Sequence, residues 1–426
     1  MLLVFIVFMV LLFMGVPVGF AILIGGAMFF FQDPYSLYTT IVQLPITQVQ
    51  NVNLLAVPLF ILAGNLMNAS GISSRLMDLS IALTGHMRGG LAQVSVILST
   101  LMGGVSGSAN ADVAMQSKIL GPHMLKYGYP KGYTASHISF TAMITATIPP
   151  GVSMIMFGMV GNVSIGRLFA AGLTVGLFMT VLYMIVTHIS ALVYKFEPYK
   201  KERTPFREVL KLLKVSIWAI LFPILLLVGI RLGLFTPSEV GAFACVYAII
   251  IGALVYRELT LTRLLETLKQ SVSDIGAIMF MISMSAVFGH GIPLERLPQR
   301  ATAMFSAMTD NPYVMMLIII AFLLIIGMFI EGAIVIILTT PILLPLAVSY
   351  GFDPVVFGLI LCTLSTVSNM TPPMGIAMFT ACNTLQCPLE DYVKACWPFL
   401  MVVIVGAIVY MFFPGLVLFL PNLIFG

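Results

Sequence analysis

Charged residues are scarce in this chain of 426 residues: they make up 8% of it, against 60% for hydrophobic residues. With a mean hydropathy of +1.09, a soluble globular domain is excluded, because a chain of this length cannot hide so much apolar surface from water. The small net charge of +4 is scattered and forms no basic patch for a nucleic acid. Lipid must cover most of the chain, which predicts an all-α polytopic membrane protein.

Cysteine is also rare, and no catalytic motif accompanies it. The five cysteines are Cys245, Cys362, Cys382, Cys387 and Cys396. They lie in or beside apolar segments without metal-ligand partners, so they are predicted to pack as small apolar residues. The chain contains no HExxH, CxxC, Walker-type Gly-Lys or G-x-S-x-G sequence. Nothing in it predicts an enzyme.

What the chain does contain is an internal repeat with an offset of 223 residues. The offset aligns, without a gap, Pro149-Pro150 with Pro372-Pro373, Pro122 with Pro345, and Tyr127-Gly128 with Tyr350-Gly351. Chance readily pairs leucines, but it rarely pairs three prolines and a Tyr-Gly in one register. A duplicated unit whose apolar segments are interrupted at matching positions is typical of secondary transporters.

Nine apolar segments are each about long enough to cross a bilayer: 1–31, 51–69, 132–160, 166–194, 215–232, 237–256, 271–290, 354–381 and 396–420. The first lacks the basic start of a signal peptide and is predicted to be a membrane helix. Two further stretches, 89–126 and 312–349, each have two short apolar arms around a polar or Gly-containing centre. They are predicted to be re-entrant helical hairpins, because non-helical backbone at membrane depth must be buried in protein or line a cavity.

Basic residues orient the chain. If the first hairpin enters from the cytoplasm, 16 of the 20 Lys and Arg residues lie on the cytoplasmic side of the membrane. The four on the outer side are Arg167, Arg231, Arg296 and Arg300. Segments 70–90 and 117–131 then lie inside, and the charged segments 195–214 and 257–270 are predicted to lie on the inner membrane surface as amphipathic helical arms. The second hairpin enters from the outer face, so the two copies are inverted.

The tip of the first hairpin is polar. Ser106, Ser108 and Asn110 surround Gly107, and Asp112 follows. Glycine allows the chain to reverse, and the Ser and Asn side chains add oxygen ligands that suit a hard cation such as Na⁺. Helix capping is the alternative, with Asp112 in the first turn of the second arm.

The paired prolines predict two broken helices. Each proline lacks an N–H and clashes with the preceding turn, so two in succession end one half-helix and begin another. Carbonyls freed before the first break can ligate a cation, while the new half-helix, through Ser153, points its positive end at an anion. The predicted Na⁺ ligands are Ser106, Ser108, Asn110, Thr145, Ile148 and Pro149 in the first copy, and Gly327, Gly332, Ser368, Asn369 and Thr371 in the second.

Glu331 lies at the predicted tip of the second hairpin. An ionisable group at that depth costs several kcal/mol unless it is paired or hydrated, so it is a functional candidate. The alternative is a charge that only stabilises a helix N-terminus. The predicted substrate contacts are Ser108, Pro150, Ser153, Glu331, Pro373 and Gly375.

These motifs resemble the large membrane subunit of the tripartite ATP-independent periplasmic (TRAP) transporters, the DctM type. The resemblance rests on the run from Gly104 to Asp112, on Pro122 to Tyr129, on Ile148-Pro149-Pro150 and on Thr371-Pro372-Pro373-x-Gly375. It implies an inverted-repeat, elevator-type ion-transporter fold in the bacterial inner membrane. It also implies Na⁺-coupled import of organic anions, a periplasmic binding protein and a separate small four-helix membrane subunit as partners.

Within that family, the stretch from Ser106 to Gln116 is most similar to the sialic acid transporters. Asn110 stands where many members have a small residue. Glu331 would repel a carboxylate, so it is expected to contact hydroxyl, amide or amine groups of the substrate or to act through a cation. Sialic acid offers such groups and succinate does not.

The resemblance implies two bodies. Residues 89–160 and 312–381 would form the moving transport domain. Residues 1–88 and 161–311 would form the scaffold with its arms, and 382–426 a C-terminal membrane helix. Three alternatives remain: a carrier of C4-dicarboxylates or other carboxylates, a self-sufficient Na⁺/carboxylate symporter, and an intramembrane enzyme. The enzyme would need a nucleophile or metal triad at membrane depth, and the sequence shows none.

Overall fold

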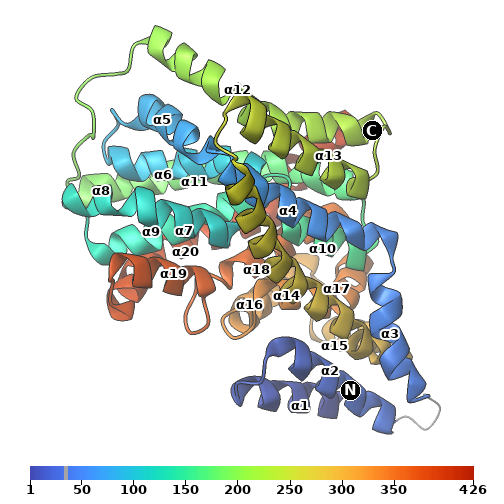
Figure 1. Ribbon diagram of the computed structural model, residues 1–426. Helices are drawn as coiled ribbons and strands as arrows, with labels where there is room; N and C mark the ends of the chain where they lie inside the picture. Colours follow the sequence, from blue (N-terminus) through green and yellow to red (C-terminus); the bar gives the residue numbers. More distant parts are fainter. Residues whose placement is uncertain (33–36) are drawn as a thin grey trace.

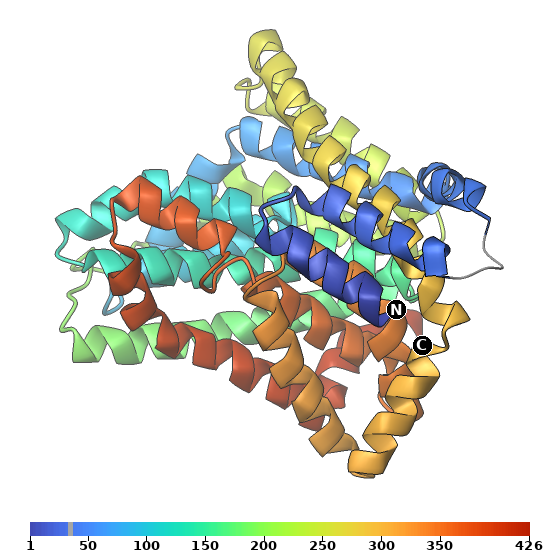
Figure 2. The same ribbon diagram turned by 90° about the horizontal axis from the view of Figure 1, so that it is seen from below.

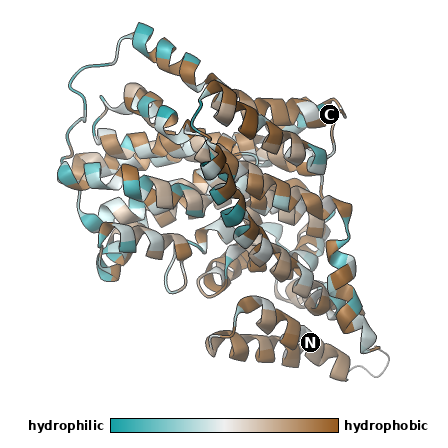
Figure 3. Cartoon of the chain, in the orientation of Figure 1, coloured by the Kyte–Doolittle hydropathy of each residue, from teal (hydrophilic) through white to brown (hydrophobic). Residues whose placement is uncertain are grey.

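The computed structural model describes residues 1–32 and 37–426, and every regular element among them is helical (Figure 1). Six helices are long and apolar enough to cross a membrane, or up to nine if each bent pair counts as one span. Apolar residues cover most of the helical surface in Figure 3, and hydrophilic ones concentrate toward the ends of helices and in connections. The prediction of an all-α polytopic membrane protein is therefore confirmed.

The predicted repeat appears as two matching sets of helices. The first set is α6 (Gly90–Ser106), α7 (Ala109–Ile119), α8 (Gly121–Lys126), α9 (Lys131–Thr147), α10 (Val152–Val160) and α11 (Ile165–Val193). The second set is α16 (Pro312–Gly327), α17 (Gly332–Ser349), α18 (Pro354–Val367), α19 (Ile376–Leu385) and α20 (Leu389–Phe412). Adding 223 to 109 and 126 gives 332 and 349, the bounds of α17. The repeat thus extends to α11 and α20, beyond the predicted hairpins and broken helices.

Both predicted hairpins are present. Helix α6 ends at Gly107, whose φ of +58° favours glycine, and α7 begins one residue after Ser108. Helices α16 and α17 are joined by residues 328–331. Each hairpin therefore ends in a short non-helical tip.

Both predicted breaks are also present. The chain bends by 50° between α9 and α10, and residues 368–375 separate α18 from α19. The peptide bonds Pro149–Pro150 and Pro372–Pro373 are both cis. The half-helix α10 starts close to the first hairpin tip, since a Cβ at Gly107 would lie 3.5 Å from the Cα of Gly151.

The remaining helices surround these two sets. They are α3 (Thr39–Val49), α4 (Ala56–Ala69), α5 (Ile72–Thr84), α12 (Phe206–Arg231), α13 (Pro237–Ile250), α14 (Leu261–Leu294) and α15 (Leu297–Met308). A short 3₁₀ helix (Val52–Leu55) precedes α4 and a π-helical turn (Ile251–Val255) ends α13. Helix α14 crosses the front of the molecule in Figure 1 and packs against α2, α3, α4 and α17.

The first apolar segment is not one membrane helix, so that prediction was wrong. It forms α1 (Leu2–Phe13) and α2 (Val18–Gln32), which lie side by side in Figures 1 and 2. Gly15 has a φ of +80°, and Pro17 has no N–H with which to continue a helix. These two residues turn the chain back on itself.

The arm predicted at 257–270 does not end before the membrane segment predicted at 271–290 but continues into it. A single helix of 34 residues, α14, begins at Leu261. The Thr260 hydroxyl caps it by accepting a hydrogen bond from the N–H of Arg263 at 3.3 Å. Neither Gly nor Pro occurs between Leu261 and Asp274, so nothing interrupts the helix where the membrane segment was expected to start.

Two further boundaries differ from the predictions. Residues 382–426 do not form one helix: α19 continues to Leu385, and α20 and α21 (Pro414–Phe425) follow, separated at Phe413. Pro414 ends α20, because it cannot donate to a preceding carbonyl. The segment 70–90, expected to be a loop, contains α5, whose buried face packs against α6 and α12.

Connections that were predicted to be cytoplasmic meet at one end of the molecule. The N–H of Lys200 donates to the carbonyl of Gly85 at 2.9 Å, and Lys131 Nζ donates to the carbonyl of Gln386 at 3.0 Å. Arg167 Nη2 donates to Asn422 Oδ1 at 3.3 Å, and Figure 1 marks the C-terminus at the opposite end of the molecule from α8. The arrangement agrees with the distribution of charge used to orient the chain.

Candidate functional site

One cavity of about 560 Å³ lies where both hairpin tips and both helix breaks converge. Helices α4 and α14 supply the opposite wall. Seven of the predicted site residues line this cavity: Ser106, Ser108, Asn110, Ser153, Glu331, Gly332 and Asn369. The repeat therefore brings together side chains that lie more than 200 residues apart in the sequence.

The first tip packs directly on the first break. A Cβ atom at Gly107 would lie 2.0 Å from the carbonyl oxygen of Pro150, so only glycine fits there. Pro149 and Pro150 have no N–H, and the carbonyls of Thr145 and Ala146 consequently lose their helical donors. On its other side the tip meets α4, where a Cβ at Gly64 would lie 2.7 Å from the carbonyl oxygen of Ser106.

The second tip packs on the end of α18 in the same way. A Cβ at Gly332 would lie 2.1 Å from the carbonyl oxygen of Ser365 and 3.1 Å from Ser368 Oγ. Each tip thus places a glycine against a backbone carbonyl of a broken helix. Carbonyl and hydroxyl oxygens at such positions are the ligands that Na⁺ takes in proteins.

Several oxygens on the cavity wall have no protein partner among the described residues. They are Ser106 Oγ, Asn110 Oδ1 and Asn68 Oδ1. Ser106 is only 6% exposed, and a buried polar atom without a partner is expected to serve a ligand or an ion. Ser108 differs, because its hydroxyl caps α7 by accepting from the N–H of Ala111 at 3.4 Å.

Glu331 occupies the N-cap position of α17 but makes no side-chain cap. Its half-buried side chain lines the cavity, and no described residue forms a hydrogen bond or ion pair with its carboxylate. The N-cap position also suits the alternative, a charge that stabilises a helix N-terminus, so the position of Glu331 meets the requirement of both predictions. Glu331 is available to a substrate or a cation.

Asp112 has a different environment. Its fully buried carboxylate accepts hydrogen bonds from Ser99 Oγ (2.7 Å), Thr145 Oγ1 (2.7 Å) and Gln116 Nε2 (3.0 Å). These partners come from α6, α9 and α7. Asp112 is therefore neither a helix cap nor a cavity residue; it links both arms of the first hairpin to the broken helix.

The other predicted site residues do not line the cavity: Thr145, Ile148, Pro149, Pro150, Gly327, Ser368, Thr371, Pro373 and Gly375. Ile148 is buried against Gly103 and Gly176. Ser368 Oγ donates to the carbonyl of Ser365 at 2.5 Å, and Thr371 Oγ1 to that of Val367 at 3.2 Å. These two hydroxyls donate to backbone carbonyls of α18, and their oxygens keep lone pairs that a cation could use.

The sequence interpretation missed the wall that α4 and α14 provide. Asn65 Nδ2 donates to Asp274 Oδ2 and to Ser271 Oγ, both at 3.0 Å. Gln270 Nε2 donates to Asp274 Oδ1 at 3.0 Å. Asn65, Asn68, Gln270 and Asp274 all line the cavity. The available signal was Asp274 itself, an ionisable residue within a predicted membrane segment.

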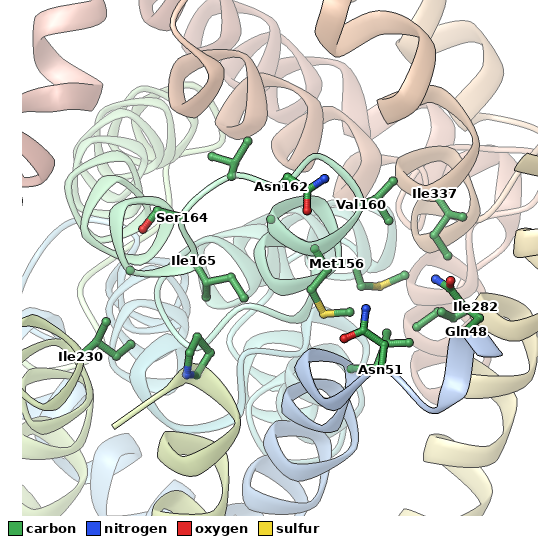
Figure 4. Close-up of a pocket in the computed structure, with 16 residues that line it drawn as sticks. Gln48, Asn51, Met156, Val160, Asn162, Ser164, Ile165, Ile230, Ile282 and Ile337 are labelled. Atoms are coloured by element: carbon green, nitrogen blue, oxygen red, sulfur yellow. The ribbon is translucent and has the colours of Figure 1, made fainter. Parts of the chain in front are cut away.

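Figure 4 shows a second cavity, of about 440 Å³. Its polar wall comes from Gln48 and Asn51 on one side and from Asn162 and Ser164 on the other. Met156 of α10 lines both cavities. In the predicted orientation the second cavity faces the periplasm.

Comparison with known proteins identifies the family. The family model for the DctM component of the tripartite ATP-independent periplasmic transporters matches residues 5–416. The sialic acid TRAP transporter large permease protein SiaM of Vibrio cholerae is 33% identical over 98% of this chain and 97% of its own length. The ectoine/5-hydroxyectoine TRAP transporter large permease protein UehC of Ruegeria pomeroyi is 31% identical over 99% of each chain.

Solved structures support the fold. The YdaH transporter of Alcanivorax borkumensis, described as having an unusual topology, aligns with a TM-score of 0.61 over 90% of each chain, at 14% identity. These matches involve transporter permeases and not enzymes. The chain belongs to the DctM family of TRAP transporter large permeases, multi-pass proteins of the bacterial inner membrane that work with a small membrane subunit and a periplasmic binding protein.

Proposed function

We propose that this chain is the carrier subunit of a Na⁺-coupled importer of a small organic acid, and that it works by an elevator motion. One observation supports this most strongly: both hairpin tips and both helix breaks wall a single cavity. A transporter needs substrate and coupling ions close together, and the repeat supplies two similar half-sites around one space.

Each half-site would hold Na⁺ between a tip and a break. In the first, Ser106 Oγ lacks a protein partner, and the carbonyls of Thr145 and Ala146 lack helical donors because of Pro149 and Pro150. In the second, Gly332 and Asn369 line the cavity. Hydroxyl, amide and carbonyl oxygens of this kind favour Na⁺ over softer ions.

The substrate would lie between the tips. The N-terminus of α10, with Ser153 on the cavity wall, offers a positive dipole end to a carboxylate. Glu331 would accept hydrogen bonds from the rest of the molecule. Sialic acid, named for the Vibrio cholerae relative, has hydroxyl and amide donors for this purpose, whereas succinate has none.

The moving body would be larger than residues 89–160 and 312–381. Helix α11 is tied to the first copy by Thr100 Oγ1–Thr180 Oγ1 (2.8 Å) and by His137 Nε2–Thr187 Oγ1 (2.9 Å). In α20, Tyr392 Oη donates to the carbonyl of Met370 at 2.8 Å. Because α11 and α20 are also copies of each other, we assign both to the moving body. Helices α4, α5, α12, α13 and α14 would form the scaffold.

Reconstituted uptake tests this function. Proteoliposomes should contain the chain with its small subunit, and several labelled organic acids, sialic acid and ectoine among them, should each be presented with and without the binding protein and an inward Na⁺ gradient. We expect uptake only when all of these components are present. Uptake by the chain alone would support the self-sufficient symporter instead, and Na⁺-independent uptake would overturn the coupling.

A further inference from the structure

We propose that the substrate of this carrier is a zwitterion, a carboxylate that also carries a cationic nitrogen, and that Asp274 is the residue that selects it. The inference deepens the proposed function and depends on it. It rests on the negative charge of the cavity wall and on the positions of its two acidic residues, Glu331 at the second hairpin tip and Asp274 on α14.

All the charge on the cavity wall is negative. Glu331 and Asp274 are its charged residues, and no Lys, Arg or His occurs among the described residues that line it. Glu331 has no protein partner in the described part of the chain. The partners of Asp274 are the amides of Asn65 and Gln270, which fix the orientation of the carboxylate without neutralising it. The negative charges of these two carboxylates can therefore be compensated only by a cationic group that comes from outside the protein.

An independent observation also indicates a ligand. Ser106 is 94% buried, being 6% exposed, and its Oγ lines the same cavity without a partner among the described residues. A cavity of about 560 Å³ with such an atom on its wall is a built site and not a surface depression.

Na⁺ at the half-sites does not satisfy Asp274. The proposed Na⁺ ligands lie on the tips and breaks of the two repeats, whereas Asp274 lies on the cavity wall that α14 supplies, outside both repeats. A substrate carboxylate has a separate partner in the N-terminus of α10 at Ser153. A molecule with both charges could thus bind α10 with its carboxylate and Asp274 with its cationic nitrogen. A dicarboxylate would place a second negative charge near Asp274 or Glu331.

The location of Asp274 adds a mechanistic consequence. Glu331 belongs to the moving body, but Asp274 and Asn65 belong to the scaffold. Asp274 therefore contacts the substrate only when the body is in the position that this structure shows. It acts as a specificity-determining residue on one side of the transport cycle.

The test is equilibrium binding to the purified chain with its small subunit, at saturating Na⁺. The binding protein is left out, so that the measured selectivity is that of the membrane site alone. The probes are ectoine (a zwitterion), N-acetylneuraminate (a monoanion) and succinate (a dianion). We expect ectoine to bind at least ten times more tightly than succinate, with N-acetylneuraminate between them. Equal or tighter binding of succinate or N-acetylneuraminate by the parent protein would overturn the proposal.

Variants test whether Asp274 causes the preference for a zwitterion. Asp274→Asn should lower the affinity for ectoine at least ten-fold, so that the three probes bind with similar affinity. Asp274→Glu should retain the preference for ectoine. Glu266→Gln is the matched control, because it removes one negative charge from the exposed surface of the same helix without lining the cavity; it should bind like the parent. An unchanged preference in Asp274→Asn would contradict the role of Asp274. Failure of this inference leaves Na⁺-coupled uptake intact, whereas failure of the proposed function removes the Na⁺ dependence for every probe.

Discussion

In the first hairpin, the carboxylate of Asp112 lies between the arms and accepts hydrogen bonds from Ser99, Gln116 and Thr145. In the second hairpin, the carboxylate of Glu331 lies at the tip, faces the cavity and has no partner among the described residues. The two hairpins share their arm lengths, a glycine packed on a carbonyl and a broken helix beside the tip. Under the 223-residue offset Asp112 aligns with Val335 and Glu331 with Ser108, so the two carboxylates are not copies of one residue. One stabilises its hairpin and the other remains available to a ligand.

The tips themselves differ in a related way. The first tip is short and consists of Gly107 and Ser108, while the second spans residues 328–331. The first is held by its own cap at Ser108 and by contact with Gly64 of α4. We infer that the first half-site is the more rigid of the two, and that the second supplies the adjustable contacts to the substrate.

The largest effect is expected for Asp112→Ala. The substitution removes a buried acceptor that Ser99, Gln116 and Thr145 share, although Thr145 and Gln116 keep a second acceptor on Ser99. Because Ser99 Oγ and one N–H of Gln116 lose their acceptor and a cavity is left between the arms, the free energy of unfolding should fall by about 3 kcal/mol. Thermal unfolding of the detergent-purified protein measures this. Glu331→Ala removes the carboxylate of the second hairpin, which has no hydrogen-bond partner among the described residues, and should leave the unfolding temperature nearly unchanged. Equal losses in both variants would remove the distinction between the two carboxylates.

Gly107→Ala and Gly332→Ala should each abolish most uptake. A methyl group would lie about 2 Å from the carbonyl oxygen of Pro150 or Ser365, so the tip must move away from its break and separate the Na⁺ ligands. Gly276→Ala on α14, where a Cβ meets nothing within 4 Å, is the control and should transport like the parent. Normal Na⁺-driven uptake in both tip variants would show that close contact between tip and break is not needed.

Glu331→Gln should reduce uptake roughly 10- to 100-fold, the range expected for losing a hydrogen bond to a charged group. The amide keeps the size of the side chain, so stability should not change. Initial rates of uptake in proteoliposomes provide the measurement. A variant that transports as well as the parent would exclude Glu331 from the site.

The smallest effects are expected for Ser106→Ala and Asn369→Ala. Each removes one neutral oxygen from one half-site, and the Na⁺ concentration for half-maximal uptake should rise roughly three- to ten-fold. Because Ser106 lies in the more rigid half-site, we expect its effect to be the larger. If neither substitution alters Na⁺ activation, the ions bind elsewhere.

The sequence was sufficient to predict both hairpins and both breaks, because Gly107 and the paired prolines impose backbone conformations that depend little on their surroundings. It also predicted Glu331 as a functional candidate at the second hairpin tip, because burying an ionisable side chain at membrane depth costs free energy. The role of Asp112 was not predictable, because a first-turn position does not say which way a side chain points. Asn65 and Asp274 come together only when α4 packs on α14, a contact that no local pattern encodes.

The most direct test of the central claim is the distance between the moving body and the scaffold during transport. Spin labels at Lys118 on α7 and Val246 on α13, both exposed, would be introduced after replacement of the five buried cysteines. We expect two distance populations whose ratio changes with Na⁺ and substrate, while a pair within the body, Lys118 and Val405, stays constant. A single unchanged Lys118–Val246 distance during active uptake would contradict the elevator motion and favour local opening of the hairpins.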